Sequence, residues 1–86
     1  NLEAISEAIT KLPEIMNVHH MHVWQLNDKE IHLEAHAEFK DDISISQFDH
    51  ILYKVEQLLY KEYVINHVNI QPEYSKDDPK YIIVQD

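Results

Sequence analysis

The sequence predicts a small α+β domain in which two helices cover one face of a three-stranded sheet. Apolar residues recur every three or four positions in two segments, which is the period of an amphipathic helix. In three other segments they recur at every second position, which is typical of a strand with one buried face. The order along the chain is α-β-β-α-β, and this order favours helices layered on a single sheet.

The first helix is predicted over residues 2–12. Leu2, Ile5 and Ile9 recur at helical spacing, with polar and acidic residues between them. Pro13 ends the segment, because proline lacks a backbone N–H and disfavours helical geometry in the residue before it.

A hairpin is predicted next. Residues 18–26 are rich in β-branched and aromatic side chains, and residues 31–39 alternate between apolar and polar side chains. The polar residues 27–29 between them are typical of a turn. The two strands should therefore pair in antiparallel fashion, each with one polar face.

The register of this hairpin places histidines side by side. A three-residue turn pairs His20 with His36, and it also pairs Trp24 with His32. A five-residue loop would instead place His22 opposite His36. With either turn, His36 lies beside a histidine of the first strand.

The second helix is predicted to begin at Ser46, with Asp49 three residues later in a capping-box arrangement. Ser44 is the competing cap. A third strand is predicted over residues 64–73, with Pro72 at its end or at an edge position.

Residues 1–74 are predicted to form the domain and residues 75–86 a C-terminal tail. The tail starts as a charged turn and finishes in the apolar run 81–84, which suits a short further strand or cover for a partner. No apolar run approaches the roughly 18–20 residues that span a bilayer, and the first residues of this sequence do not include the apolar region typical of a signal peptide. Since it opens on Asn1, a processed product or an excised piece is expected.

Composition argues against several classes of function. Seven Lys and Arg stand against 16 Asp and Glu, a formal net charge of −9, which disfavours nucleic acid or an anionic membrane surface as partner and favours cations. The sequence has no cysteine, which excludes disulfides and thiolate metal sites, and no glycine, which excludes glycine-rich phosphate loops. No hydrolytic triad motif or HExxH helix is present, so the chain is not predicted to be an enzyme.

Seven histidines in 86 residues give the first positive indication of function. A single histidine on a half-buried strand is more often solvated than a metal ligand, and we expect that state for His32 and, on the second helix, for His50. The expected polar face of the sheet carries His20, His22, Trp24, His32, Glu34, His36, Glu38, His67 and Glu73. Because three strands bring imidazoles and carboxylates to one face, a divalent-metal site is favoured.

Three motifs point to a family. Residues 18–24 read V-H-H-M-H-V-W, residues 35–36 read A-H, and residues 67–73 read H-V-N-I-Q-P-E. They resemble the V-H-D-L-H-V-W segment, the second-strand A-H and the H-V-T-I-Q-x-E ending of the cytoplasmic C-terminal domain of cation diffusion facilitator transporters. The resemblance covers residues 2–74, with the same order of elements.

The resemblance implies a ferredoxin-like, metallochaperone-like domain that forms a homodimer on the cytoplasmic face of a membrane. Divalent metal ions would bind this domain and tighten the dimer. The closed dimer would then favour efflux by the transmembrane domain of the same transporter.

The family's usual ligands fall on His19, His36 and Glu73. Strand parity alone favours other histidines and puts His19 on the core side, so the two lines of reasoning agree on His36 and Glu73. His20 replaces the family's usual Asp and would add a ligand or create a second site, while Pro72 alters the presentation of Glu73. The predicted metal residues are His19, His20, His22, His36, His67 and Glu73, with Asp49 and His50 as further candidates.

Zn²⁺ is the leading ion, with Co²⁺, Cd²⁺ and Ni²⁺ as alternatives. A free-standing soluble metal buffer or chaperone of the same fold is the alternative function, and a small-molecule sensor with incidental histidines is a third. Because imidazole must be neutral to bind a metal, affinity is expected to fall as pH drops through about 6.5.

Overall fold

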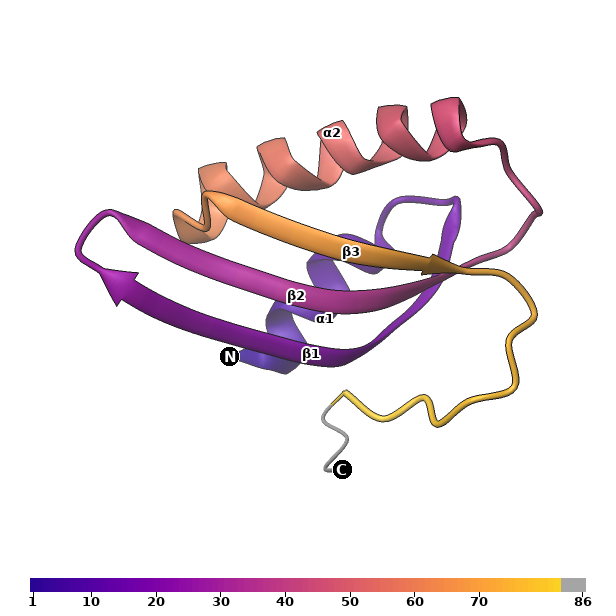
Figure 1. The fold of residues 1–86 in the computed structure, drawn as a ribbon, viewed down its shortest axis with the longest axis horizontal. Helices are drawn as coiled ribbons and strands as arrows, with labels where there is room; N and C mark the ends of the chain where they lie inside the picture. The colour runs from indigo at the N-terminus through magenta and orange to yellow at the C-terminus, as the bar shows by residue number, and fades with distance from the viewer. Residues whose placement is uncertain (83–86) are drawn as a thin grey trace.

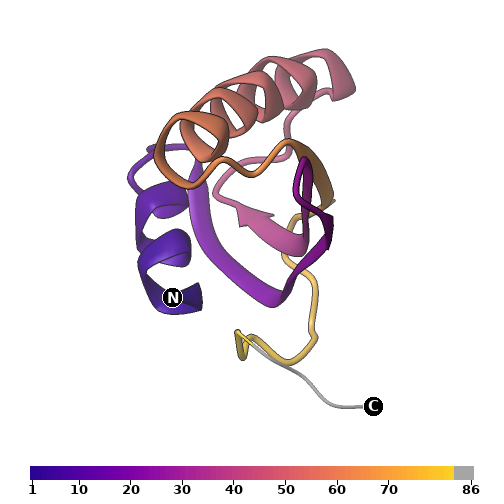
Figure 2. The same ribbon diagram turned by 90° about the vertical axis from the view of Figure 1, so that its left-hand side faces the viewer.

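The computed structural model describes residues 1–82. The elements follow the predicted order: α1 (Leu2–Thr10), β1 (Ile15–Asn27), β2 (Glu30–Phe39), α2 (Ile45–Tyr63) and β3 (His67–Glu73). The sheet has the order β1-β2-β3, with β1 antiparallel and β3 parallel to the central β2. Both helices pack on one side of it and leave the other side open (Figures 1 and 2), which confirms the predicted α+β architecture.

The core lies between the helices and the covered face of the sheet. Buried residues from every helix and strand contribute to one apolar cluster, which includes Ile9, Val18, Leu33, Leu59 and Ile70. Since side chains alternate along a strand, burial of the odd-numbered apolar residues of β2 turns its even-numbered histidines and glutamates to the open face.

Helix α1 is capped by Asn1, whose side-chain oxygen accepts hydrogen bonds from two backbone N–H groups of the first turn. The helix ends at Thr10, two residues earlier than predicted. Beyond it the backbone tightens, because Leu12 N–H donates to the carbonyl of Ile9 at three-residue spacing.

Helix α2 begins after Ser44, so the prediction of Ser46 as its cap was wrong. Ser44 Oγ accepts from the N–H of Gln47, and Gln47 Oε1 accepts from the N–H of Ser44 at 2.9 Å. This reciprocal pair satisfies two donors at once, an advantage that Ser46 and Asp49 do not provide.

The hairpin turn is shorter than predicted, but the register beside it is as predicted. Asn27 pairs with Glu30, and an irregularity between Gln25 and Asn27 restores the pairing of Trp24 with His32. These last two side chains therefore lie on the open face of the sheet.

Further along, a β-bulge in β1 changes the register. His36 pairs with His19, and its predicted pairing with His20 or His22 was wrong. Between His19 and His22 the strand carries one residue more than the facing part of β2, and His20 in this bulge has a φ of 52°. One extra residue reverses strand parity, which a sequence pattern does not reveal.

The bulge puts His19 on the open face. Val18 before it and Met21 after it are both buried in the core. His19, which strand parity had assigned to the core side, instead lies opposite His36. It is nevertheless fully buried.

The tail folds back along the outer edge of β1 (Figure 1). The carbonyl of Tyr81 accepts from His20 N–H at 2.8 Å, and that of Ile82 accepts from Met21 N–H at 2.5 Å. These bonds pair edge amides that β2 does not reach. The rest of the predicted apolar run, Ile83 and Val84, lies outside the described residues. Within residues 1–82, no helix combines the length and apolarity needed to cross a membrane.

Candidate metal centre

Two histidines and two carboxylates meet at one end of the open face. One ligand atom from each of His19, His36, Glu73 and Asp78 lies within 4.8 Å of all the others. The four side chains come from β1, β2, the end of β3 and the tail. Segments far apart in the sequence therefore build this cluster.

His19 is held in one orientation by Asn17. Its Nδ1 lies 2.7 Å from Asn17 Oδ1, which only accepts, so Nδ1 carries the proton. In the neutral ring, Nε2 then presents its lone pair to Glu73 Oε1 at 2.9 Å and to Asp78 Oδ2 at 3.3 Å. A lone pair facing two carboxylates is repulsive unless a proton or a metal ion lies between them. Outer partners such as Asn17 orient metal-binding histidines.

Glu73 joins the two histidines. Its Oε2 lies 2.8 Å from His36 Nδ1, but this contact lacks the geometry of a hydrogen bond. The Glu73 side chain is only 1% exposed, and burial of a carboxylate is costly unless a positive group accompanies it. The ammonium groups of Lys80, 3.4 Å from Oε1, and Lys76, 3.7 Å from Oε2, supply part of that charge, and an ion shared with both histidines would add to it.

The spacing of the cluster suits a tetrahedral ion. The four N···O contacts, which involve both oxygens of Glu73 and Oδ2 of Asp78, run from 2.8 to 4.0 Å. Bonds of about 2.0–2.1 Å at tetrahedral angles place ligand atoms about 3.3 Å apart. The side chains therefore need little movement to enclose Zn²⁺.

Two lysines accompany the carboxylates. Lys80 Nζ donates to Asp78 Oδ1 and lies 3.4 Å from Glu73 Oε1, and Lys76 Nζ lies 3.7 Å from Glu73 Oε2. The hydrogen bond from Lys80 lowers the pKa of Asp78 to about 2, and the same bond raises the pKa of Lys80. Both groups are therefore charged at neutral pH, and Asp78 is a carboxylate ready to bind a metal.

Two further predicted residues border this cluster. The ring of His20 lies 4.7 Å from that of His36, centroid to centroid, and the ring of His22 lies 5.4 Å from that of His20. Neither belongs to a group of three or more potential ligands among residues 1–82. His20 occupies the bulge, where its backbone shapes the site.

The remaining predicted residues lie elsewhere. His67 pairs with His32 at the start of β3. Asp49 and His50 are exposed on α2, and no group of three potential ligands in the described part of the chain includes them.

The sequence prediction did not include Asp78. It belongs to a run of charged and polar residues that is typical of a solvated turn. Only the return of the tail to β1 brings it to His19, and the one sequence signal for that return is the apolar run at 81–84.

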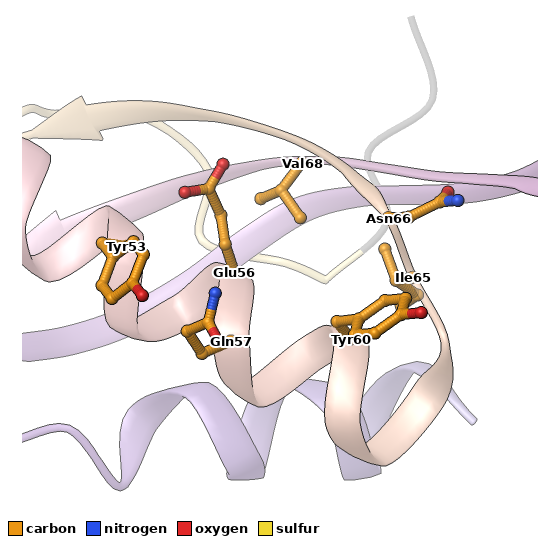
Figure 3. Close-up of a pocket in the computed structure, with 7 residues that line it drawn as sticks. All are labelled: Tyr53, Glu56, Gln57, Tyr60, Ile65, Asn66 and Val68. Atoms are coloured by element: carbon orange, nitrogen blue, oxygen red, sulfur yellow. The ribbon is translucent and has the colours of Figure 1, made fainter.

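A groove between α2 and β3 has no comparable chemistry (Figure 3). It has a volume of about 280 Å³ and is lined by Tyr53, Glu56, Gln57, Tyr60, Ile65, Asn66 and Val68. A single carboxylate without imidazoles is not a transition-metal site.

Comparison with known proteins identifies the family. Residues 1–75 match the family model of the cation efflux protein cytoplasmic domain. The chain belongs to this family. The resemblance to cation diffusion facilitators is thereby confirmed, and the family consists of metal-transport proteins rather than an enzyme class.

Relatives of this cation efflux domain are metal transporters. The zinc transporter ZitB of Pectobacterium atrosepticum is 33% identical over 79 residues, which cover 91% of this chain and 23% of that protein. The cadmium, cobalt and zinc/H(+)-K(+) antiporter of Bacillus subtilis is 37% identical over 59 residues, 69% of this chain and 19% of that protein. The chain thus spans less than a quarter of the length of these two relatives.

Solved structures share the fold of this cation efflux domain. The metal-bound C-terminal domain of the CzcD transporter from Cuprividus metallidurans superposes with a TM-score of 0.70 at 26% identity, over 85% of this chain and 97% of that one. The C-terminal domain of the magnetosome protein MamB from Desulfamplus magnetovallimortis has a TM-score of 0.74 at 19% identity, over 91% of this chain and 96% of that one. At that identity the second likeness concerns the fold alone.

Proposed function

We propose that this chain is the cytosolic metal-sensing domain of a cation efflux transporter. Zn²⁺ binds between His19, His36, Glu73 and Asp78 and stabilises a closed homodimer. The closed dimer favours efflux by the transmembrane domain of the same protein, on whose cytoplasmic side this domain lies.

The orientation of His19 carries the proposal. Asn17 fixes the proton on Nδ1, so Nε2 faces the carboxylates of Glu73 and Asp78 at 2.9 and 3.3 Å. Two imidazoles and two carboxylates at tetrahedral spacing favour Zn²⁺, and relatives named zinc transporters support this choice. Co²⁺, Cd²⁺ and Ni²⁺ remain alternative ions for the same site.

Charge links metal binding to dimer closure. Each chain carries a formal net charge of −9, so two copies repel each other. A bound divalent cation offsets part of that charge. On this proposal the ion binds the closed state more tightly than the open state, and it therefore stabilises the closed state by mass action.

Calorimetric titration of the metal-free chain with Zn²⁺ tests the site. Wild type is expected to bind with a Kd of about 1 μM or below, and His36→Ala should lose this event. His50→Ala, which changes an exposed histidine on α2, is the matched control and should bind as wild type. Equal binding by wild type and His36→Ala would remove the support for this site.

Sedimentation velocity tests the regulatory half of the proposal. Zn²⁺ should produce a more compact dimer of the wild type and of His50→Ala, but not of His36→Ala. Saturable binding without any change in mass or shape would leave a metal-binding domain that does not act through dimer closure.

A further inference from the structure

We propose a second divalent-metal site, formed by Glu30, His32 and His67 near the hairpin turn. Their potential ligand atoms all lie within 4.8 Å of one another. His32 precedes His36 by four residues on β2, which corresponds to about 13 Å. The site is therefore separate from the cluster around His36.

The sheet register builds this second site. His32 on the central strand pairs with Trp24 on one side and with His67 on the other. The rings of His32 and His67 stack at a centroid distance of 4.2 Å and an interplanar angle of 7°, and Trp24 lies 5.2 Å from His32 at 16°. A row of three aromatic rings thus crosses the open face.

His32 carries a polar atom without a partner. Its Nε2 is hidden from solvent and has no hydrogen bond with any residue in 1–82. Glu30 Oε2, at 3.7 Å, is too distant to accept one. Hidden polar atoms are nearly always paired, and an unpaired one calls for a water or an ion. The 3.7 Å gap is close to the spacing of about 3.3 Å between two ligands of a tetrahedral ion.

His67 is free to complete the site. It is exposed, so rotation of its side chain out of the stack is not blocked by packing. A hollow of about 310 Å³ beside His32 and His67, which Trp24 and Glu34 also line, leaves room for bound water. Two imidazoles, one carboxylate and water form a donor set that suits Zn²⁺.

Asn66 connects the two backbone segments that carry the second site. Its Oδ1 accepts from Ile31 N–H at 3.0 Å, and its Nδ2 donates to the carbonyl of Lys29 at 2.5 Å. Its own N–H donates to the carbonyl of Ile31 at 3.1 Å. The hairpin turn that bears Glu30 is therefore fixed to the start of β3 that bears His67, so the two backbone segments of the site are held together.

Trp24 provides a selective probe, since it is the single tryptophan of the chain and stacks on His32. Its fluorescence is followed while the 86-residue chain is titrated with Zn²⁺ alone. The fluorescence should change and saturate in wild type. It should do so equally in His36→Ala, which lacks a ligand of the first cluster (His19, His36, Glu73 and Asp78).

Two variants remove ligands from the second site while keeping polar side chains of similar size. Glu30→Gln and His67→Gln should each lower the Zn²⁺ affinity measured from Trp24 fluorescence by about tenfold or more. Both should keep the wild-type circular dichroism and the binding event that His36→Ala loses. A Trp24 response unchanged in both variants, or absent from folded wild type, overturns the second site. Loss of the Trp24 response in His36→Ala would assign that response to the first cluster, and it would equally overturn the second site.

Discussion

At the scale of single residues, Asn17 acts on the metal centre through His19. Its side-chain oxygen accepts the Nδ1 proton at 2.7 Å and so directs Nε2 toward the carboxylates. Without it the ring can change tautomer or turn, and both changes remove the lone pair from the site.

Asn17→Ala should therefore lower Zn²⁺ affinity by about 10- to 100-fold while all four proposed ligands stay in place. Calorimetric titration measures the loss. Asn69→Ala, an exposed amide on β3, is the control and should leave binding at the first cluster unchanged. Wild-type affinity in Asn17→Ala would mean that His19 needs no orienting partner.

The pH dependence of binding also belongs to this scale. The hydrogen bond from Lys80 lowers the pKa of Asp78 from 3.8 to about 2. Asp78 therefore stabilises the docked tail above about pH 4, and this contribution is lost as pH falls toward 2. Between pH 7.5 and 5.5 Asp78 stays ionised, so a change in that range comes from other groups.

Zn²⁺ affinity should fall between pH 7.5 and 5.5, because protons compete with the metal ion for the imidazole nitrogens. Titrations at three pH values measure this. Asp78→Asn should bind more weakly at every pH yet show the same slope. A flat profile in the wild type would mean that imidazoles are not the ligands.

At the scale of elements, the bulge in β1 decides which histidine reaches the site. His20 has a φ of 52°, and Val64 at the end of α2 has a φ of 58°. This left-handed region favours glycine, and a β-branched residue such as Val64 is costly there. The chain has no glycine to place at either position.

His20→Gly should raise stability by about 0.5–1 kcal/mol and leave Zn²⁺ affinity nearly unchanged, provided that His20 contributes its backbone rather than a ligand. Thermal unfolding and calorimetry measure the two effects. Val64→Gly, far from the cluster, should stabilise the fold in the same way. A large loss of affinity in His20→Gly alone would make His20 a ligand.

The tail is the second element that acts on the site, and its two charged residues act with opposite sign. Asp78→Asn should weaken Zn²⁺ binding by about tenfold, because it removes a charged ligand. Lys80→Gln should strengthen binding by about fivefold, because an ammonium group 3.4 Å from Glu73 opposes the incoming cation. Calorimetry on both variants measures the effects, and a change of the same sign in both would contradict this account.

At the scale of the whole molecule, metal binding should stabilise a chain that is small for an independent fold. Zn²⁺ at 100 times its Kd adds about 2.7 kcal/mol, or roughly 10 °C or more in Tm for a domain of this size. Thermal unfolding with and without Zn²⁺ measures the shift. His36→Ala should show a clearly smaller one, and a full shift in that variant would mean that the first cluster is not the main source of stabilisation.

The sequence predicted the order of helices and strands, the covered and open faces of β2, and the pairing of Trp24 with His32. Local periodicity carries this information, because burial alternates with the geometry of each element. It also indicated a metal site with His36 and Glu73, since these lie on regular strands whose parity is reliable.

By itself, then, the sequence determined the architecture, the family and the open face on which histidines and carboxylates gather. The tertiary structure decided which of them meet. One extra residue in β1 brings His19 rather than His20 opposite His36, and the folded-back tail adds Asp78. Both depend on backbone hydrogen bonds between distant segments, which leave no period in the sequence.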